Sequence, residues 1–255
     1  MGSATNLSWV FRHPWAALTG AYNRLRYPSY KRQVGPPKRY DALGEYQFEL
    51  LKLWGLLPQH SLLDIGCGSL RAGRYFIPYL ESGKYFGIEP DRHLVESGIG
   101  HNLDEQTLRE KRPAIRYDAD FDLGAFHRTF DFLLAHAIFT HASQAQIRKC
   151  FYGARRAMSP NSMFCATYNK GDSDYLGERW IYHARDCDEG LGRVSYTFAC
   201  LAGLAGEAGL ACAEVDAEHP SGSSWIMACL SGCQVLSSGR IGPHRISTEE
   251  VPRRR

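Results

Sequence analysis

The chain has 255 residues, a formal net charge of +3 and eight cysteines, none of them in a C-x-x-C pair. This length suits one α/β domain with an N-terminal extension. Scattered cysteines within apolar runs are typical of a reducing compartment, and they argue against a disulfide framework or a zinc site. No apolar run reaches the ~18 residues of a transmembrane helix. We therefore expect a cytoplasmic protein that holds no metal.

Residues 1–40 are predicted to form a basic, aromatic N-terminal arm. The arm carries seven Lys or Arg residues and no Asp or Glu. Its apolar residues recur at helical spacing, namely Trp9, Val10, Phe11, Trp15 and Leu18. Such a segment suits peripheral contact of residues 9–39 with the inner face of a membrane, or a lid over a pocket. A solvated, disordered terminus is the third interpretation.

Residues 41–236 are predicted to form the cofactor-binding domain. This stretch has 18 basic and 25 acidic residues, a balance of −7, so its charge is opposite to that of the arm. Apolar residues recur at helical spacing over residues 41–57, and Pro58 ends this first helix. An acidic domain offers no basic face to nucleic acid, so we expect no nucleic-acid partner.

The next stretch, residues 61–73, reads SLLDIGCGSLRAG. Apolar residues around one acid at 62–65 predict a short buried strand. Gly-Cys-Gly at 66–68 predicts a sharp turn, and a helix follows from Arg71. A glycine turn lets the backbone approach a ligand closely, and free N–H groups at the helix start face that ligand. The stretch therefore predicts a nucleotide-type cofactor site.

Two further strands are predicted over residues 84–89 and 114–121. The first ends in Glu89, 25 residues after Asp64. A carboxylate at such a strand tip can accept hydrogen bonds from both hydroxyls of a ribose. The other interpretation of this acid is a helix N-cap or an exposed loop residue.

A fourth strand is predicted over residues 130–141, with His136 and His141 at its exit. A helix follows over 143–158 and a fifth strand over 159–167. An imidazole titrates near neutrality and can take a proton from a hydroxyl group. Both histidines are therefore candidate catalytic residues, and a packing or capping role stays open for each.

The rest of the chain predicts an insertion, a hairpin and a tail. Residues 169–193 are polar and aromatic and are predicted to be an insertion on the substrate side. Only six residues separate the strands predicted over 211–217 and 224–230. A parallel crossover needs about a dozen, so this pair must be antiparallel. The tail, residues 237–255, has five Arg against two Glu and is predicted to be disordered.

Together these elements predict an α/β fold. We expect a Rossmann-like, seven-stranded, mostly parallel sheet with helices on both faces and an antiparallel terminal strand. A nicotinamide-binding Rossmann domain lacks the closing hairpin. Arg71 also stands where the dinucleotide fingerprint G-x-G-x-x-G has its third glycine. Both features disfavour an NAD(P)-dependent oxidoreductase, which stays open as an alternative.

The motif D-I-G-C-G-S-L-R at residues 64–71 resembles motif I of class I S-adenosylmethionine (SAM) methyltransferases. More narrowly, it is similar to a bacterial branch that acts on small molecules or glycans. The resemblance covers residues 41–231 and implies SAM as the cofactor. It also implies the cofactor contacts: Asp64 near the amino-acid end, backbone at Gly66, Cys67 and Gly68, Glu89 on the ribose, Asp120 with Phe121 at the adenine, and His136 beside the methyl group.

The function that this resemblance implies is SAM-dependent methyl transfer. We favour an oxygen of a small molecule or glycan as the acceptor, with His136 and His141 as the candidate catalytic residues. Two alternatives remain, an NAD(P)-dependent Rossmann oxidoreductase and a non-catalytic SAM-fold scaffold or membrane-associated partner.

Overall fold

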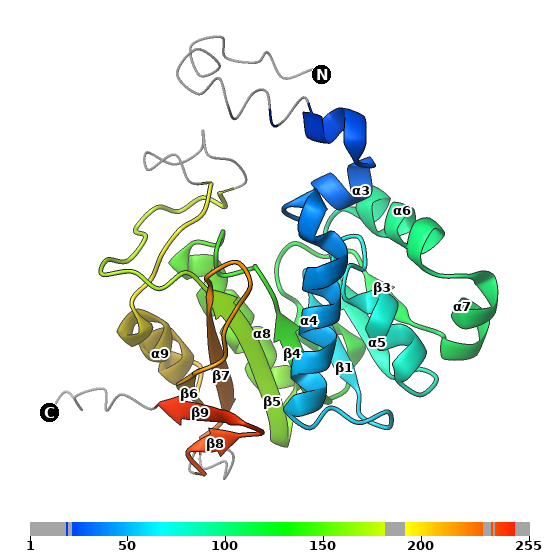
Figure 1. Cartoon of the computed structure of the whole chain (residues 1–255). Helices are drawn as coiled ribbons and strands as arrows, with labels where there is room; N and C mark the ends of the chain where they lie inside the picture. Colours follow the sequence, from blue (N-terminus) through cyan, green and yellow to red (C-terminus); the bar gives the residue numbers. More distant parts are fainter. Residues whose placement is uncertain (1–18, 20–21, 182–191, 232–235, 237, 248–255) are drawn as a thin grey trace, which may run out of the picture.

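The structure is a computed structural model that describes residue 19 and residues 22–181, 192–231, 236 and 238–247. Within this part of the chain, one sheet has the strand order β3-β2-β1-β4-β5-β7-β6-β9-β8. Helices cover both faces of the sheet (Figure 1). The Rossmann-like α/β fold predicted from the sequence is confirmed.

Five parallel strands form one half of this sheet. They are β1 (Leu62–Ile65), β2 (Tyr85–Ile88), β3 (Ala114–Arg116), β4 (Phe130–Ala135) and β5 (Met158–Tyr168). Most are apolar and buried on both faces, as parallel strands covered by helices are. In the centre, Asp64 lies opposite Gly87 of β2 and Leu134 of β4. The carboxyl ends of these strands therefore meet at one edge of the sheet.

The predicted antiparallel pair closes the other half. β6 (Leu210–Val215) and β7 (Ser224–Leu230) pair antiparallel, and β7 also runs antiparallel to β5. Because both pairings are antiparallel, β6 runs in the direction of β5. The loop over residues 216–223 thus lies at the sheet edge where β1–β5 end.

Two additional strands correct the prediction of seven. β8 (Arg240–Ile241) and β9 (His244–Ser247) form a hairpin, and β9 pairs with β6. The expectation of disorder from residue 237 was therefore wrong for residues 240–247. Ile241 and Ile246 are buried in the same apolar cluster as Trp54. These isoleucines give the tail a face to bury, which its basic charge alone does not indicate.

Two apolar layers, one on each face of the sheet, hold the helices. One layer includes residues of α4 (Tyr40–Leu53), α5 (Gly73–Tyr79) and α6 (Arg92–Asn102). The other includes residues of α8 (Gln144–Ala157) and α9 (Phe198–Glu207). α7 (Glu105–Lys111) and the 3₁₀ turn η2 (Leu123–Phe126) lie in the connections. Side chains of Asp91, Ser143 and Thr197 cap α6, α8 and α9 and fix where these helices begin.

The described part of the arm packs onto the domain. α3 (Ser29–Arg32) and the 3₁₀ turn η1 (Pro37–Arg39) lead into α4. Tyr30 and Tyr40 are buried together with Leu94 of α6. Residues 30–40 are therefore part of the packed structure, although the arm reads as a separate segment in the sequence.

The amphipathic stretch predicted near Trp9 and Leu18 lies outside the described residues. Membrane contact through residues 9–39 therefore stays a prediction. Among the residues that the structure describes, no helix is both long and apolar enough to cross a bilayer.

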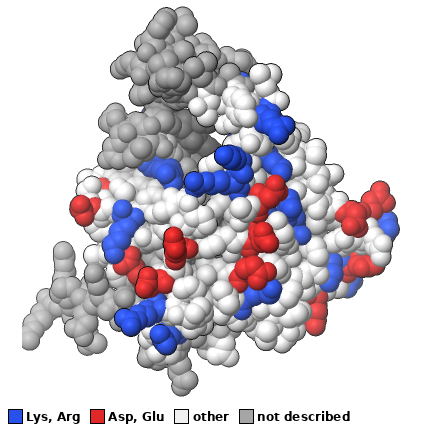
Figure 2. All heavy atoms as spheres, in the orientation of Figure 1, with Lys and Arg blue, Asp and Glu red and all other residues white. Residues whose placement is uncertain are grey.

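Charge is distributed unevenly over the surface. On the face drawn in Figure 2, Lys and Arg gather toward the end of the molecule where α3 lies, and Asp and Glu lie mostly away from it. Lys31, Lys38 and Arg39 belong to this basic end in sequence. The contrast between a basic arm and an acidic domain thus persists in the folded chain.

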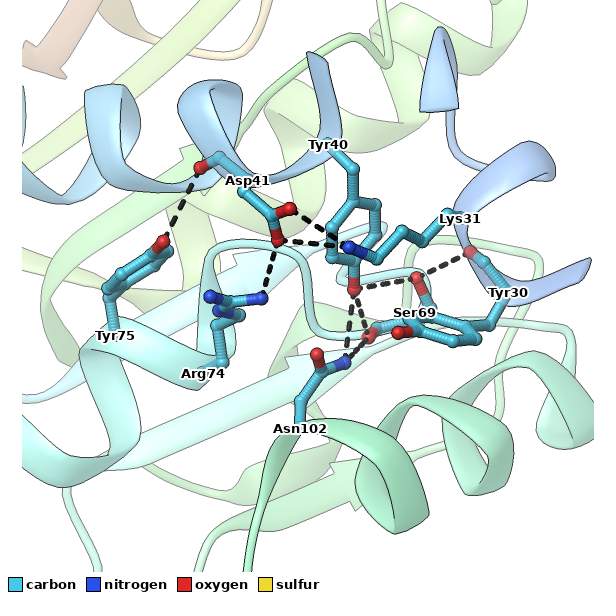
Figure 3. Close-up of polar contacts among 8 residues, drawn as sticks. All are labelled: Tyr30, Lys31, Tyr40, Asp41, Ser69, Arg74, Tyr75 and Asn102. Carbon is cyan, nitrogen blue, oxygen red and sulfur yellow. Dashed lines mark hydrogen bonds and ion pairs between the residues drawn. The ribbon is translucent and has the colours of Figure 1, made fainter. Parts of the chain in front are cut away.

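Polar contacts tie the arm to the loop that follows β1 (Figure 3). The Ser69 hydroxyl donates to the carbonyl oxygen of Tyr30 at 2.8 Å. The Tyr40 hydroxyl and the Asn102 amide donate to the carbonyl oxygen of Ser69 at 2.9 and 3.0 Å. These buried bonds fix the loop from three sides, so the arm helps to shape the candidate site beside it.

Candidate active site

The turn between β1 and α5, residues 66–68, is built around two glycines. Gly66 has φ +72° and Gly68 has φ +55°, a region that glycine enters without strain. A Cβ on Gly66 would lie 2.1 Å from Cδ1 of Ile138, and a Cβ on Gly68 would lie 2.7 Å from Cγ1 of Val34. The backbone of this turn therefore comes closer to its neighbours than a side chain would permit.

Asp64 lies buried directly before the turn. Its carboxylate accepts a hydrogen bond from the Tyr85 hydroxyl at 2.8 Å. Burial raises the pKa of Asp64 to about 6, although the Tyr85 bond and the charge of Arg71 favour its ionised form. Cys67 is also buried, and burial raises the pKa of its thiol well above the usual value. Cys67 therefore acts as an apolar packing residue, and its backbone N–H donates to the carbonyl oxygen of Ile88 at 3.1 Å.

Glu89 stands at the tip of β2 and faces the glycine turn, as predicted. One carboxylate oxygen accepts the N–H of Gly68 and the other accepts the N–H of Asp91, each at 3.1 Å. Burial raises the pKa of Glu89, while these two backbone bonds favour its charged form. The backbone of the turn and this carboxylate thus form one wall of the site, which we call the turn wall.

Polar contacts of Arg71 and two histidines lie beside the turn wall. Arg71 donates through Nη1 to the carbonyl oxygen of Val34 at 2.5 Å, and its Nη2 lies 3.1 Å from Nδ1 of His136. Nε2 of His136 lies 2.9 Å from Nε2 of His219, which comes from the β6–β7 loop. We call the carbonyl group of Val34, the side chain of Arg71 and the histidine pair, His136 and His219, the polar wall.

Both histidines of the polar wall are held in the neutral form. Burial, followed by the nearby charge of Arg71, lowers the pKa of His136 well below its usual value. Burial and the charges of Arg71 and Arg193 lower the pKa of His219 to about 4. Near neutral pH the positive charge of this wall therefore belongs to Arg71.

A small cavity lies where the turn meets Arg71 and His136. It measures about 30 Å³ and is lined by Val34, Gln47, Asp64, Gly66, Cys67, Gly68, Arg71, Ala72 and His136. This is about the share of liquid volume that one water molecule occupies. A nucleoside cofactor needs more room, so Val34 must move aside before such a ligand can contact the turn.

The structure brings together six of the predicted cofactor residues but not Asp120 and Phe121. These two residues line a separate surface hollow of about 380 Å³ against α8. Asp120 forms an ion pair with Lys149 at 2.9 Å. The loop turns around Asp118, whose carboxylate accepts the N–H groups of Asp120 and Asp122, and this directs Asp120 toward α8. The adenine contact expected of Asp120 and Phe121 therefore stays a prediction.

His141 likewise has other partners than the histidine pair. Its Nδ1 donates to the carbonyl oxygen of Ile181 at 2.7 Å, and its ring stacks on Trp180 at a centroid distance of 5.9 Å. His141 therefore holds the described part of the insertion against the exit of β4.

The sequence singles out His136 of the polar wall but gives Arg71, His219 and Val34 no contact in the site. A signal for His219 was available, because the antiparallel hairpin places residues 216–223 at the edge where β4 ends. Val34 carries no such signal, since its position depends on how the arm packs.

Comparison with known proteins points to methyltransferases. Residues 63–164 match the family model described as a methyltransferase domain. No curated protein matches the sequence. Magnesium protoporphyrin IX methyltransferase (ChlM) from Synechocystis PCC 6803, crystallised with bound SAM, has a TM-score of 0.56 at 10% identity, covering 91% of this chain and 100% of that chain.

Two further solved structures illustrate the range of similar proteins. PH0226 from Pyrococcus horikoshii OT3 has a TM-score of 0.57 at 13% identity, covering 83% of this chain and 99% of that chain. The glycopeptide N-methyltransferase MtfA, complexed with SAM, has a TM-score of 0.53 at 11% identity, covering 73% and 94%. At such low identity the likeness shows the fold alone. The chain has the α/β fold of class I SAM-dependent methyltransferases.

Proposed function

We propose that this protein is a SAM-dependent methyltransferase that acts on an oxygen of a small molecule or glycan. The observation that carries the proposal is the turn wall, in which Glu89 at the tip of β2 bonds the N–H of Gly68. A close-approach backbone and a carboxylate bonded to it then stand together, which suits an adenosine with its ribose diol. The methyltransferase-domain match and the SAM-bound structures of similar fold support this cofactor.

The residues present fit such a cofactor. Gly66 and Gly68 carry no side chain, so a ligand could reach their backbone once the side chains of Ile138 and Val34, which pack against them, make room. Glu89 would hold the ribose, and the buried Asp64 would face the amino-acid end. The adenine contact with Asp120 and Phe121 would require the loop after β3 to turn away from α8.

Bound SAM supplies a methyl group on a sulfonium. Transfer to a hydroxyl forms a carbon–oxygen bond while the carbon–sulfur bond breaks, and the hydroxyl proton must leave. We assign this proton to Nδ1 of His136, which becomes available when Arg71 releases it. The lowered pKa of His136 makes it a weak base. His141, bonded to Ile181, would position the insertion rather than take the proton.

Calorimetric titration tests the cofactor. We expect S-adenosylhomocysteine (SAH) and SAM to bind one site with micromolar affinity, and NAD⁺, NADH and NADPH to give no heat. Binding of a nicotinamide nucleotide without SAH would replace the proposal with an oxidoreductase. Incubation with methyl-labelled SAM and a panel of hydroxyl and carboxyl acceptors then tests turnover, and tight SAH binding without any transfer would favour the scaffold alternative.

Peripheral membrane contact through residues 9–39 is a second part of the proposal. The basic composition of the arm supports attraction to anionic lipid. We expect the full chain to co-sediment with phosphatidylglycerol vesicles at low salt and not with phosphatidylcholine vesicles. Equal recovery with both vesicle types would remove the membrane from the proposal.

A further inference from the structure

Three polar contacts in a row run from Arg71 through the histidine pair to the β6–β7 loop. Nη2 of Arg71 lies 3.1 Å from Nδ1 of His136, and Nε2 of His136 lies 2.9 Å from Nε2 of His219. At the far end, the N–H of Ser221 donates to Nδ1 of His219 at 3.1 Å. Both ends of the row are fixed as donors, because neither a guanidinium nor a backbone N–H can accept a hydrogen bond.

The two imidazole rings bring more protons than the contacts of this row can use. A neutral imidazole carries one N–H, so the two rings together bring two protons. Only the middle contact, between His136 and His219, needs one of them. The second ring proton must therefore point at a group that is itself a donor, either Arg71 or the N–H of Ser221.

The stronger of the two end contacts determines at which end of the row two donors face each other. A hydrogen bond from a charged guanidinium is roughly twice as strong as one between neutral groups. Arg71 therefore keeps its bond to Nδ1 of His136, and the His136 proton sits on Nε2. His219 must then carry its proton on Nδ1, where it faces the N–H of Ser221.

An anionic oxygen in the cavity that Arg71 and His136 line would remove the conflict by replacing their direct contact. His136 could then carry its proton on Nδ1 and donate to the anion. His219 would carry its proton on Nε2, donate to His136, and accept the N–H of Ser221 at Nδ1. Each ring still holds one proton, and each contact has one donor and one acceptor.

Arg71 has a further donor available for such a ligand. Its Nε is buried and has no hydrogen-bond partner among the residues that the structure describes. A buried, unsatisfied donor on a charged group is costly, and Arg71 lines the cavity together with His136. An oxyanion in this position would satisfy that donor.

The charges near the cavity are mixed, with basic groups at the β6–β7 loop and one carboxylate, Asp64, on the lining. Arg39 donates to the carbonyl oxygen of Pro220, in the same loop as His219, at 2.9 Å. Lys and Arg side chains gather toward the end of the molecule where α3 lies (Figure 2). Asp64 also lines the cavity, but its carboxylate is bonded by the Tyr85 hydroxyl.

We propose that the cavity lined by Arg71 and His136 is an oxyanion seat of carboxylate type, and that an anion there replaces their direct contact and switches the tautomers of both histidines. The proposal rests on the proposed function for one of its two sources of carboxylate, the amino-acid end of the cofactor. The other source is an acidic acceptor. In either case a filled seat makes Nδ1 of His136 a hydrogen-bond donor to the ligand. The seat and the base role that we propose for this nitrogen therefore exclude each other, and the experiments below decide between them.

Nitrogen-15 NMR of the imidazole rings tests the switch directly. The protein has ten histidines, so His136→Gln and His219→Gln variants are needed to assign the two rings. In the ligand-free protein we expect the proton of His136 on Nε2 and that of His219 on Nδ1. Saturation with SAH moves them to Nδ1 and Nε2 if the seat holds the cofactor carboxylate. If SAH leaves them unchanged but acetate added to the SAH-bound protein moves them, the seat holds the acceptor.

Affinity measurements provide a second, independent test. If the cofactor fills the seat, Arg71→Gln should weaken SAH binding by about 10- to 100-fold and leave decarboxylated SAH unchanged. If the acceptor fills it, Arg71→Gln should leave both nucleosides unchanged and abolish the acetate effect. Arg74→Gln removes the neighbouring arginine, which pairs with Asp41, and should change none of these values.

The outcomes separate this inference from the proposed function. Rings that keep their tautomers with SAH, and with acetate added to the SAH complex, would overturn the oxyanion seat while leaving the cofactor assignment intact. Failure of the wild-type protein to bind either SAH or its decarboxylated analogue would overturn the proposed function. The wild-type NMR experiment decides the matter even if Arg71→Gln does not fold.

Discussion

The two walls of the candidate site are assembled in different ways. In the turn wall, the bonds from Gly68 to Glu89 and from Tyr85 to Asp64 each span 21 residues of sequence. In the polar wall, the contacts of Arg71 with Val34 and of His136 with His219 span 37 and 83 residues. The first wall follows from a strand–turn–helix unit and the next strand. The second exists only after the arm and the closing hairpin have packed, so substitutions should affect the two walls differently.

The largest effect is expected where the turn wall depends on backbone conformation. Gly66→Ala places a Cβ at φ +72° and 2.1 Å from Ile138. Left-handed strain costs about 1–2 kcal/mol, and overpacking adds about 1–3 kcal/mol. Urea unfolding should show a loss of about 2–5 kcal/mol in the free energy of unfolding, together with loss of SAH binding.

Gly83→Ala is the matched control for that variant. Gly83 has a similar φ of +70°, but nothing lies within 4 Å of the added Cβ. It should lose only the strain contribution of about 1–2 kcal/mol and bind SAH normally. Equal losses in both variants would show that the close approach to Ile138 does not matter.

The next effect concerns the carboxylate of the turn wall. Glu89→Gln removes the charge that we expect to hold the ribose, and hydrogen bonds to charged groups contribute about 1.5–3 kcal/mol. SAH should therefore bind about 10- to 100-fold more weakly by calorimetry. Because the amide of Gln can accept only one of the two backbone N–H groups of Gly68 and Asp91, the free energy of unfolding should also fall by about 1–3 kcal/mol. Glu105→Gln, which removes an exposed partner of Arg109 on α7, is the control. An unchanged dissociation constant in Glu89→Gln would reject the ribose role.

The contrast between the walls explains what the sequence could predict. The turn wall was predictable because a short buried strand, two glycines and an acidic strand tip each leave a local pattern. The closing hairpin was predictable because six residues cannot make a parallel crossover. His219 could have been found by combining that hairpin with the edge where β4 ends.

Other features had no local signal. Resemblance to the family puts Asp120 and Phe121 at the adenine, but the carboxylate of Asp118 folds their loop toward α8. The strand β9 was not predicted because the basic composition of the tail indicates disorder, although Ile246 within it is buried. In each case a contact distant in sequence, or a side chain bonded to its own loop, outweighs the local pattern.

A smaller effect is expected where the arm meets the domain. Tyr40→Phe removes a buried hydroxyl that donates to the Ser69 carbonyl and accepts from Asn102 (Figure 3). It should reduce the free energy of unfolding by about 1–2 kcal/mol. Tyr75→Phe removes a hydroxyl whose contact with the Asp41 carbonyl is long, 3.5 Å, and should change stability by less than about 0.5 kcal/mol. Similar losses in the two variants would show that the arm is not fixed through Tyr40.

The smallest effect is expected at the exposed ion pairs beside that contact. Asp41 bonds Lys31 at 2.9 Å and Arg74 at 2.7 Å, and its side chain is 56% exposed. Burial acts to raise the pKa of Asp41, but Lys31 and Arg74 outweigh it and lower the pKa. A lowered folded-state pKa adds stability above the unfolded value, and that stability is lost as the pH falls through the folded value.

Asp41→Asn should therefore lose no more than about 1 kcal/mol at neutral pH and low salt, because exposed pairs are screened. The loss should shrink in 1 M NaCl and disappear at a pH below the folded-state pKa of Asp41. Glu49→Gln removes an ion pair with Lys52 on the same helix and provides the baseline for a single pair. A loss in Asp41→Asn no larger than in Glu49→Gln would mean that the arm is held by its buried tyrosines, with the surface charges adding nothing to its attachment.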